Sequence, residues 1–230
     1  MNIAIIPARS GSKGLNNKNI KMLNGMPLLA YTIQAALQSE LFQEVMVSTD
    51  SREYAEIAKE FGAQVPFMRS QKLADDITSS WDVVREVLDN YRKDGREFDT
   101  IALLQPTSPL RSSTDIINGF SLMKEKKANL VVGVCEMDHS PLWSNTLPDN
   151  LSMEKFIDPE LTKLPRQSIP KYYRINGAIY IVKVDYLENR SNIYEKDSFA
   201  LLMSKYNSID IDDEFDFKLA SMILADKNNM

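Results

Sequence analysis

Short apolar runs alternate along this chain with segments whose apolar residues recur at helical spacing. Runs of this length are typical of strands buried on both faces, and their alternation with helices predicts an α/β fold with a mostly parallel central sheet. We expect strands at Ile3–Ile6, Glu44–Ser48, Gln64–Phe67 (a short edge strand), Asp99–Leu104, Leu130–Cys135, Gly177–Val182, Phe199–Met203 and Ser208–Asp212. We expect helices at Pro27–Gln38, Arg52–Phe61, Trp81–Arg92, a segment ending near Lys127, Val184–Glu188 and Asp213–Ala225.

The alternation breaks between Met137 and Pro170, where prolines are frequent and the apolar residues show no period. The segment is longer than ordinary loops. We interpret it as a flap, or as an arm that packs on a second subunit. The whole chain of 230 residues is expected to form one domain around a sizeable core.

A cluster of positive charge follows the first strand. Small residues (Ser10, Gly11, Ser12, Gly14) would let backbone amides approach a ligand, and Arg9, Lys13, Lys18 and Lys21 are interspersed with or follow them. The first acidic residue is Glu40, although the net charge is −5. The loop matches neither GxxxxGK[ST] nor GxGxxG. It is either a polyphosphate cradle or a solvated basic loop.

Two carboxylates near the end of the chain predict a metal site. In an extended segment Ile209 and Ile211 face the core, while Asp210 and Asp212 project together on the other side. Paired carboxylates suit Mg²⁺, which shares its remaining positions with water and substrate phosphates. Asp213 and Asp216 are instead expected to cap the helix that follows.

A proline-fixed loop, Gln105–Arg111, follows a predicted central strand. Ligands of open α/β sheets bind at the carboxyl ends of the strands, so Gln105, Thr107 and Ser108 are candidates for hydrogen bonding to a ligand. A rigid turn without a binding role is the alternative.

These stretches together resemble the sugar-acid cytidylyltransferases, especially the CMP-sialic acid (N-acylneuraminate) synthetases, over nearly the whole chain. The similar runs are P-A-R-x-x-S-K-G with K-N (from Pro7 to Asn19), L-L-Q-P-T-S-P-L-R, S-I-D-I-D, P-R-Q (Pro165–Gln167), R-x-N-G-A-I-Y-I (Arg174–Ile181) and the serines after Asp76. The resemblance implies a three-layer Rossmann-like nucleotidyltransferase fold with a dimerisation arm at residues 137–170. It also implies transfer of CMP from CTP to the anomeric hydroxyl of a nine-carbon sugar acid, with Mg²⁺ as cofactor, pyrophosphate as product and a homodimer as the assembly.

The resemblance also assigns candidate site residues. Catalysis is assigned to Arg9, Lys13, Lys18 and Asp212, and metal binding to Asp210 and Asp212. Nucleotide binding is assigned to Ala8, Arg9, Ser12, Lys13, Lys18, Asn19 and Ser80. Sugar binding is assigned to Gln105, Thr107, Ser108, Arg166, Arg174, Asn176, Tyr180 and Tyr194, with the two arginines as clamps on the sugar carboxylate.

Some features depart from the family pattern. Sialate synthetases tend to carry lysine where this chain has Trp143, and phenylalanines where it has Ile193 and Tyr194, near the distal end of the sugar. Legionaminate or another deoxy nonulosonate is therefore an alternative to N-acetylneuraminate. Three other functions stay open: a 3-deoxy-octulosonate cytidylyltransferase, a glycosyltransferase using Asp210-Ile211-Asp212 as a metal-binding DxD element, and a nucleotide-binding regulator without turnover.

Composition excludes several other classes. No apolar run is long enough for a membrane span, and the single Cys135 excludes a disulfide framework and a cysteine-based zinc site. The lone His139 lacks a serine nucleophile motif, so we assign it to the arm. The acidic net charge makes nucleic acid an unexpected partner, and a cytoplasmic location is expected.

Overall fold

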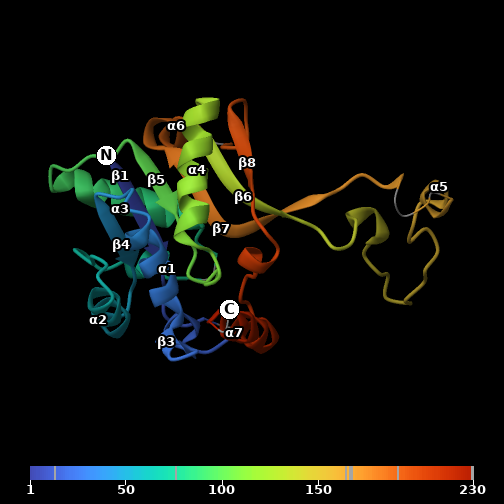
Figure 1. The fold of residues 1–230 in the computed structure, drawn as a ribbon, viewed down its shortest axis with the longest axis horizontal. Helices are drawn as coiled ribbons and strands as arrows, with labels where there is room; N and C mark the ends of the chain where they lie inside the picture. Colours follow the sequence, from blue (N-terminus) through green and yellow to red (C-terminus); the bar gives the residue numbers. More distant parts are fainter. Residues whose placement is uncertain (13, 76, 164, 166–167, 191, 229–230) are drawn as a thin grey trace.

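A six-stranded sheet forms the centre of the computed structural model, which describes residues 1–12, 14–75, 77–163, 165, 168–190 and 192–228. The strands lie in the order β4-β1-β5-β7-β6-β8, and β7 alone among these six runs antiparallel to its neighbours. Their bounds are β1 Asn2–Pro7, β4 Glu44–Ser48, β5 Thr100–Leu103, β6 Leu130–Glu136, β7 Tyr173–Lys183 and β8 Ser198–Leu202. The mostly parallel sheet predicted from the alternation is thus confirmed (Figure 1).

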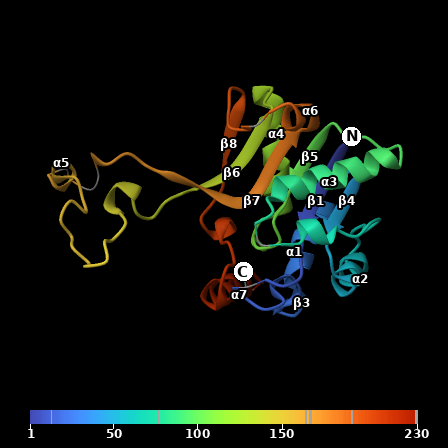
Figure 2. The same cartoon turned by 180° about the vertical axis from the view of Figure 1, so that it is seen from behind.

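Helices cover both faces of this sheet and make it the middle of three layers. Successive side chains of β1 alternate between faces, so Ala4 and Ile6 join one core cluster and Ile3 and Ile5 the other. The first cluster lies under α1 (Leu28–Gln38), α2 (Arg52–Glu60) and α4 (Ser113–Lys126). The second lies under α3 (Ser80–Lys93) and α6 (Val184–Glu188), which are seen in front of the sheet in Figure 2. The three-layer arrangement is therefore confirmed.

A smaller third cluster joins the beginning of the chain to its end. Leu15 and Leu23 pack with Phe217 of the last helix, α7 (Glu214–Asn228), beside the small hairpin of β2 (Met22–Leu23) and β3 (Met26–Pro27). The Lys21 ammonium donates to Glu214 at 2.7 Å. These contacts bring the cationic loop and the acidic segment, which are far apart in sequence, into one region of the molecule.

Two predicted strands are wrong. Gln64–Phe67 contributes only a single bridge between Gln64 and Met46, since Pro66 interrupts the hydrogen-bonding ladder. Ser208–Asp212 is not a strand: the 3₁₀ turn η5 (Tyr206–Ser208) leads into extended backbone. There the Ile211 amide donates to the Thr107 carbonyl at 2.8 Å, so this segment pairs with a loop rather than with the sheet.

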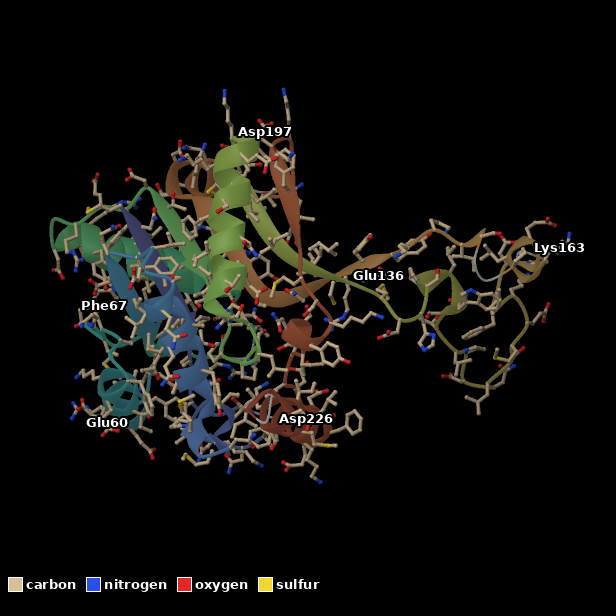
Figure 3. The ribbon with its side chains drawn as sticks, viewed as in Figure 1. Glu60, Phe67, Glu136, Lys163, Asp197 and Asp226 are labelled. Atoms are coloured by element: carbon tan, nitrogen blue, oxygen red, sulfur yellow. The ribbon has the colours of Figure 1, made fainter. Side chains whose placement is uncertain are left out.

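Residues 137–172, here named the arm, project away from the domain between β6 and β7 (Figure 1). The arm includes the 3₁₀ turn η3 (Pro141–Trp143) and the short helix α5 (Pro159–Thr162). Figure 3 labels Glu136 at the base of the arm and Lys163 far from the sheet. In the described part of the chain no helix has the length and apolar character needed to cross a membrane.

Candidate functional site

A pocket of about 430 Å³ opens at the carboxyl ends of β1 and β5. Its lining comes from four separate parts of the chain: the loop after β1, the region before and at the start of α3, the loop after β5, and the acidic segment. The lining residues include Arg9, Ser12, Gly14, Lys18, Asn19, Arg69, Asp75, Thr78, Ser80, Gln105, Thr107 and Asp212. The predicted cationic loop and one of the two predicted metal ligands therefore share a single cavity.

Another hollow, of about 480 Å³, lies at the opposite end of the central strands, near Thr100 at the start of β5 and Lys183 at the end of β7. Its arginines are already paired: Arg92 with Glu188, and Arg96 with Glu44 at 2.8 Å. A hollow whose cations are neutralised by neighbouring carboxylates offers little to an anionic ligand. The pocket of about 430 Å³ at the carboxyl ends of β1 and β5 is therefore the better candidate site.

Asp50, which follows β4, anchors the loop after β1 by accepting hydrogen bonds from Ser10. The amide and the hydroxyl of Ser10 donate to its two carboxylate oxygens at 2.8 and 2.7 Å. Burial raises the pKa of Asp50, but these hydrogen bonds and the nearby Arg69 outweigh it, so the pKa lies below its usual value. The neighbouring Ser51 caps α2, so Asp50 is available to anchor the loop.

Lys18 connects the two ends of the chain. Its ammonium donates to the Ile211 carbonyl at 2.7 Å and lies 3.4 Å from the Asp212 carboxylate, 194 residues away. Gly14 lies against the same segment, and a Cβ there would be 2.6 Å from the Asp212 carbonyl oxygen. The loop can approach the acidic segment this closely only because residue 14 has no side chain.

The acidic segment presents its two carboxylates as predicted, although it is not a strand. Ile211 is fully buried in the third cluster, while Asp210 is partly and Asp212 largely accessible. Burial, followed by the charge of Asp212, raises the pKa of Asp210 against a hydrogen bond from the Thr107 hydroxyl that lowers it. Capping of α7 is confirmed, because Asp213 accepts from the amides of Phe215 and Asp216.

The carboxylate pair fits a hard cation. The Oδ1 atom of Asp210 is buried and has no hydrogen-bond partner among the described residues. This acceptor oxygen is therefore available to a cation. In the described part of the chain no group of three or more His, Cys, Asp or Glu side chains forms a complete ligand set. A cation here would need oxygens from water or a phosphate, which is the way Mg²⁺ is commonly bound.

The loop after β5 meets β7 beside this pair. Gly177 has φ +73°, and a Cβ there would be 2.8 Å from Oε1 of Gln105 and 3.4 Å from Oδ2 of Asp210. Gln105 and Thr107 line the pocket. Ser108 is fully buried, so its hydroxyl faces the protein interior rather than the pocket.

The predicted sugar residues of β7 contact the acidic segment or α3, whereas Tyr194, which follows β7, lies apart from them. Arg174 donates to the Ser208 carbonyl at 3.0 Å, and Tyr180 packs edge-to-face on Trp81; burial raises the pKa of Tyr180 to about 12. Asn176 is buried and donates to the Ser208 hydroxyl at 2.9 Å, so it supports the acidic segment from below. Tyr194 lines a separate hollow of about 270 Å³.

Other predicted residues have more limited roles. The side chain of Ala8 is buried in the first core cluster, and the Asn19 amide donates to the Arg9 carbonyl at 3.0 Å. Ser80 is the first residue of α3 and lines the pocket, while Ser79 is the helix cap. Ile193 belongs to the second core cluster, so its difference from the family pattern does not bear on the sugar end of this chain.

Lys13 and Arg166 lie outside the described residues, and their assignments stay predictions. Sequence reasoning missed Arg69. It is buried, donates from Nε and NH2 to the hydroxyl and carbonyl of Ser48 at 3.1 and 2.6 Å, and lines the pocket. Burial lowers its pKa to about 10. Its sequence neighbours form no motif that would identify a binding residue. Its hydrogen-bond partner, Ser48, lies 21 residues earlier in the chain, at the end of β4.

Several known proteins are similar to this chain in sequence. The family described as "Cytidylyltransferase" matches residues 3–218. An N-acylneuraminate cytidylyltransferase of Escherichia coli is 44% identical over 98% of this chain, which spans only 52% of that relative's length. A CMP-N,N'-diacetyllegionaminic acid synthase of Legionella pneumophila is 37% identical, with 96% of this chain and 95% of the relative covered.

The fold has solved counterparts. A CMP-2-keto-3-deoxy-manno-octonic acid synthetase complexed with CTP superposes with a TM-score of 0.73 at 18% identity, covering 98% of this chain and 99% of that one. A 4-diphosphocytidyl-2C-methyl-D-erythritol synthase of Anaerococcus prevotii gives a TM-score of 0.64 at 14% identity, covering 97% and 98% of the two chains. At these identities the likeness concerns the fold.

Proposed function

Because this chain belongs to the cytidylyltransferase family, we propose that it is a CMP-nonulosonate synthetase. It would transfer CMP from CTP to the anomeric hydroxyl of a sialic-acid-like sugar acid and release pyrophosphate. The observation that carries the proposal is the shared cavity in which Arg9, Ser12 and Lys18 face Asp212. A triphosphate needs cations along its oxygens, and Asp212 across the cavity, together with the neighbouring Asp210, would supply ligands for its metal.

In this proposal Arg9 and Lys18 bind the triphosphate, with Lys13 as a further predicted ligand. The Lys18 ammonium, which donates to the Ile211 carbonyl and lies near Asp212, lines the cavity in which the phosphates are proposed to bind. Charge increases on the departing pyrophosphate during the reaction, and fixed cations that face it stabilise the transition state. Asn19 holds the loop carbonyl of Arg9 and keeps this group of cations in place.

Asp210 and Asp212 are the proposed ligands for Mg²⁺. When bound, the ion supplies charge neutralisation at the phosphates and acidifies a hydroxyl that it contacts. Thr107 orients Asp210 through the hydrogen bond from its hydroxyl, and α7 fixes Asp212, whose amide donates to Asp216 at 3.0 Å. The sugar is proposed to bind beside this pair, where Gln105, Arg174 and Tyr180 would orient its anomeric hydroxyl for in-line attack on the α-phosphorus.

The sugar is proposed to be a nine-carbon nonulosonate, since relatives that act on acylneuraminate and on diacetyllegionaminate cover nearly the whole chain. The test is release of pyrophosphate from CTP and Mg²⁺ with N-acetylneuraminate, N,N'-diacetyllegionaminate, pseudaminate and 3-deoxy-octulosonate. Turnover with the last alone would instead identify the octulosonate enzyme. Transfer from a nucleotide sugar without pyrophosphate release would identify the DxD glycosyltransferase, and CTP binding without any turnover the regulator.

A matched pair of variants tests the site itself. Lys18→Met removes a cation from the cavity and should lower kcat/KM by about 10²–10³-fold. Lys21→Met removes a cation three residues further on, which pairs with Glu214 and lies over the Phe217 ring outside the cavity lining. Lys21→Met should stay within a few-fold of the wild-type rate. Equal effects would contradict the assignment.

The arm is proposed to pack on a second copy of the chain. It stands away from the domain (Figure 3). Its exposed apolar side chains include Trp143, Leu147, Leu151 and Met153. Apolar side chains on an extended projection gain free energy only when another surface covers them. A homodimer that exchanges arms would cover them.

A further inference from the structure

Arg111, at the end of the loop after β5, is buried in an unusual way. The side chain is 2% exposed, and its Nε and NH2 atoms have no hydrogen-bond partner among the residues that the structure describes. Burial lowers its pKa to about 9, so the guanidinium is still protonated at neutral pH. An incompletely paired buried charge opposes folding, and its presence calls for a role other than stability.

The remaining nitrogen of Arg111 makes one specific connection. NH1 donates to the Gln105 carbonyl at 3.2 Å and to the Ala178 carbonyl of β7 at 3.1 Å. The ladder between β5 and β7 ends at the pair Leu103 and Tyr180. Arg111 therefore continues the connection between these two segments beyond the end of their ladder.

The two segments that Arg111 joins both touch the acidic segment. Thr107 of the loop accepts from the Ile211 amide at 2.8 Å and donates its hydroxyl to Asp210. Gly177 of β7 lies beside the same carboxylate, since a Cβ added to it would be 3.4 Å from Oδ2 of Asp210. A shift of the loop against β7 would move Asp210 and Gln105 together.

We infer that Arg111 is a positioning residue that fixes Asp210 and Gln105 through its bridge between the Gln105 and Ala178 carbonyls. This inference rests on the proposed function, because the geometry that it protects is that of the metal ligand and the sugar-side glutamine. Arg111 is buried and does not line the pocket, so it is not proposed to contact the nucleotide or the sugar. The geometry that Arg111 fixes explains why a buried charge that opposes folding is present here.

Three variants test this inference. Arg111→Met keeps the length of the side chain but removes its donors and charge, and Arg111→Lys keeps the charge and a donor. Ser112→Ala is the matched control: it removes the hydroxyl that accepts from the Asp115 amide at the start of α4, one residue away, without touching the bridge. Thermal unfolding, Mn²⁺ affinity in the presence of CTP measured by EPR, and pyrophosphate release are followed for each.

For Arg111→Met we expect a melting temperature equal to or above that of the wild type. The variant no longer buries a charge, and the Gln105 carbonyl keeps the Ser108 amide as a donor. Mn²⁺ should bind about 10-fold more weakly and kcat should fall about 100-fold, with little change in KM for CTP. Arg111→Lys should recover part of both losses. Ser112→Ala should melt about 2–4 °C lower with unchanged Mn²⁺ affinity and kcat.

Two results would overturn the inference: wild-type Mn²⁺ affinity in Arg111→Met, or a loss of activity that follows a lowered melting temperature without a change in Mn²⁺ affinity. The second result would make Arg111 a purely structural residue. Failure of the proposed function is a separate outcome, seen as a wild-type protein that releases no pyrophosphate with any sugar acid. The Mn²⁺ measurement involves no turnover, so a wild-type protein that binds Mn²⁺ with CTP but releases no pyrophosphate still tests the role of Arg111.

Discussion

Gly14→Ala tests how closely the cationic loop must approach the acidic segment. The added Cβ would lie 2.6 Å from the Asp212 carbonyl oxygen, so the two segments must separate by about 0.8 Å to reach ordinary contact at 3.4 Å. A displacement near 1 Å between reacting groups is enough to slow an enzyme about 10²-fold, or about 2.7 kcal/mol in activation free energy. We therefore expect kcat for pyrophosphate release to fall by about this factor.

The effect on stability should be small by comparison. Alanine lowers the conformational entropy of the unfolded chain and so stabilises by about 0.4–1 kcal/mol, which offsets part of the clash. Gly25→Ala is the control, since Gly25 has φ +87° and no atom within 4 Å of an added Cβ. Its strained backbone should lower stability by about 1–2 kcal/mol and leave kcat unchanged. The reasoning is refuted if Gly14→Ala turns over at the wild-type rate, or if both variants lose activity equally.

Three further predictions follow from the same geometry. Asp212→Asn should lose turnover by a large factor while CTP affinity, measured by calorimetry, changes little; a fully active variant would remove the metal assignment. Asp50→Asn should raise KM for CTP, because Ser10 loses an ionised acceptor. Since the pKa of Asp50 is lowered in the folded state, its contribution to stability is present above its unfolded pKa and is lost as pH falls through the folded value. Wild type and Asp50→Asn should therefore differ in unfolding free energy at pH 7 and converge below the usual carboxyl pKa of 3.8, whereas a constant difference would contradict this. Leu147→Asp with Met153→Asp in the arm should shift sedimentation from dimer to monomer if a second copy covers these exposed side chains; an unchanged dimer would place the interface elsewhere.

The local sequence determined most of the architecture. The buried strands β1 and β4, the capping of α7 by Asp213, and the irregular arm each follow from patterns that extend over a few residues. Hydrophobic periodicity and helix caps act between neighbours in the chain, and so they can be seen in the sequence. The resemblance to a family then assigned the site residues.

The predictions that failed depend on contacts between distant parts of the chain. The anchoring role of Asp50 is not visible in the local sequence, because its partner Ser10 is 40 residues away. Ser208–Asp212 looked like a strand because its apolar residues alternate, but its hydrogen-bond partner is the Thr107 loop rather than another strand. A side chain's own neighbours in the sequence do not specify which distant backbone will reach it.

By itself, the sequence determined that a cationic loop follows the first strand, that an acidic pair precedes the last helix, and that a mostly parallel sheet lies between them. Only the tertiary structure decided that Lys18 reaches the Ile211 carbonyl, that Gly14 admits the Asp212 backbone, and that Arg111 is buried at the joint beneath them. The physical reason is that local patterns specify which segments are helix, strand or loop, whereas a site is made where segments meet. That meeting is specified by packing of the whole core.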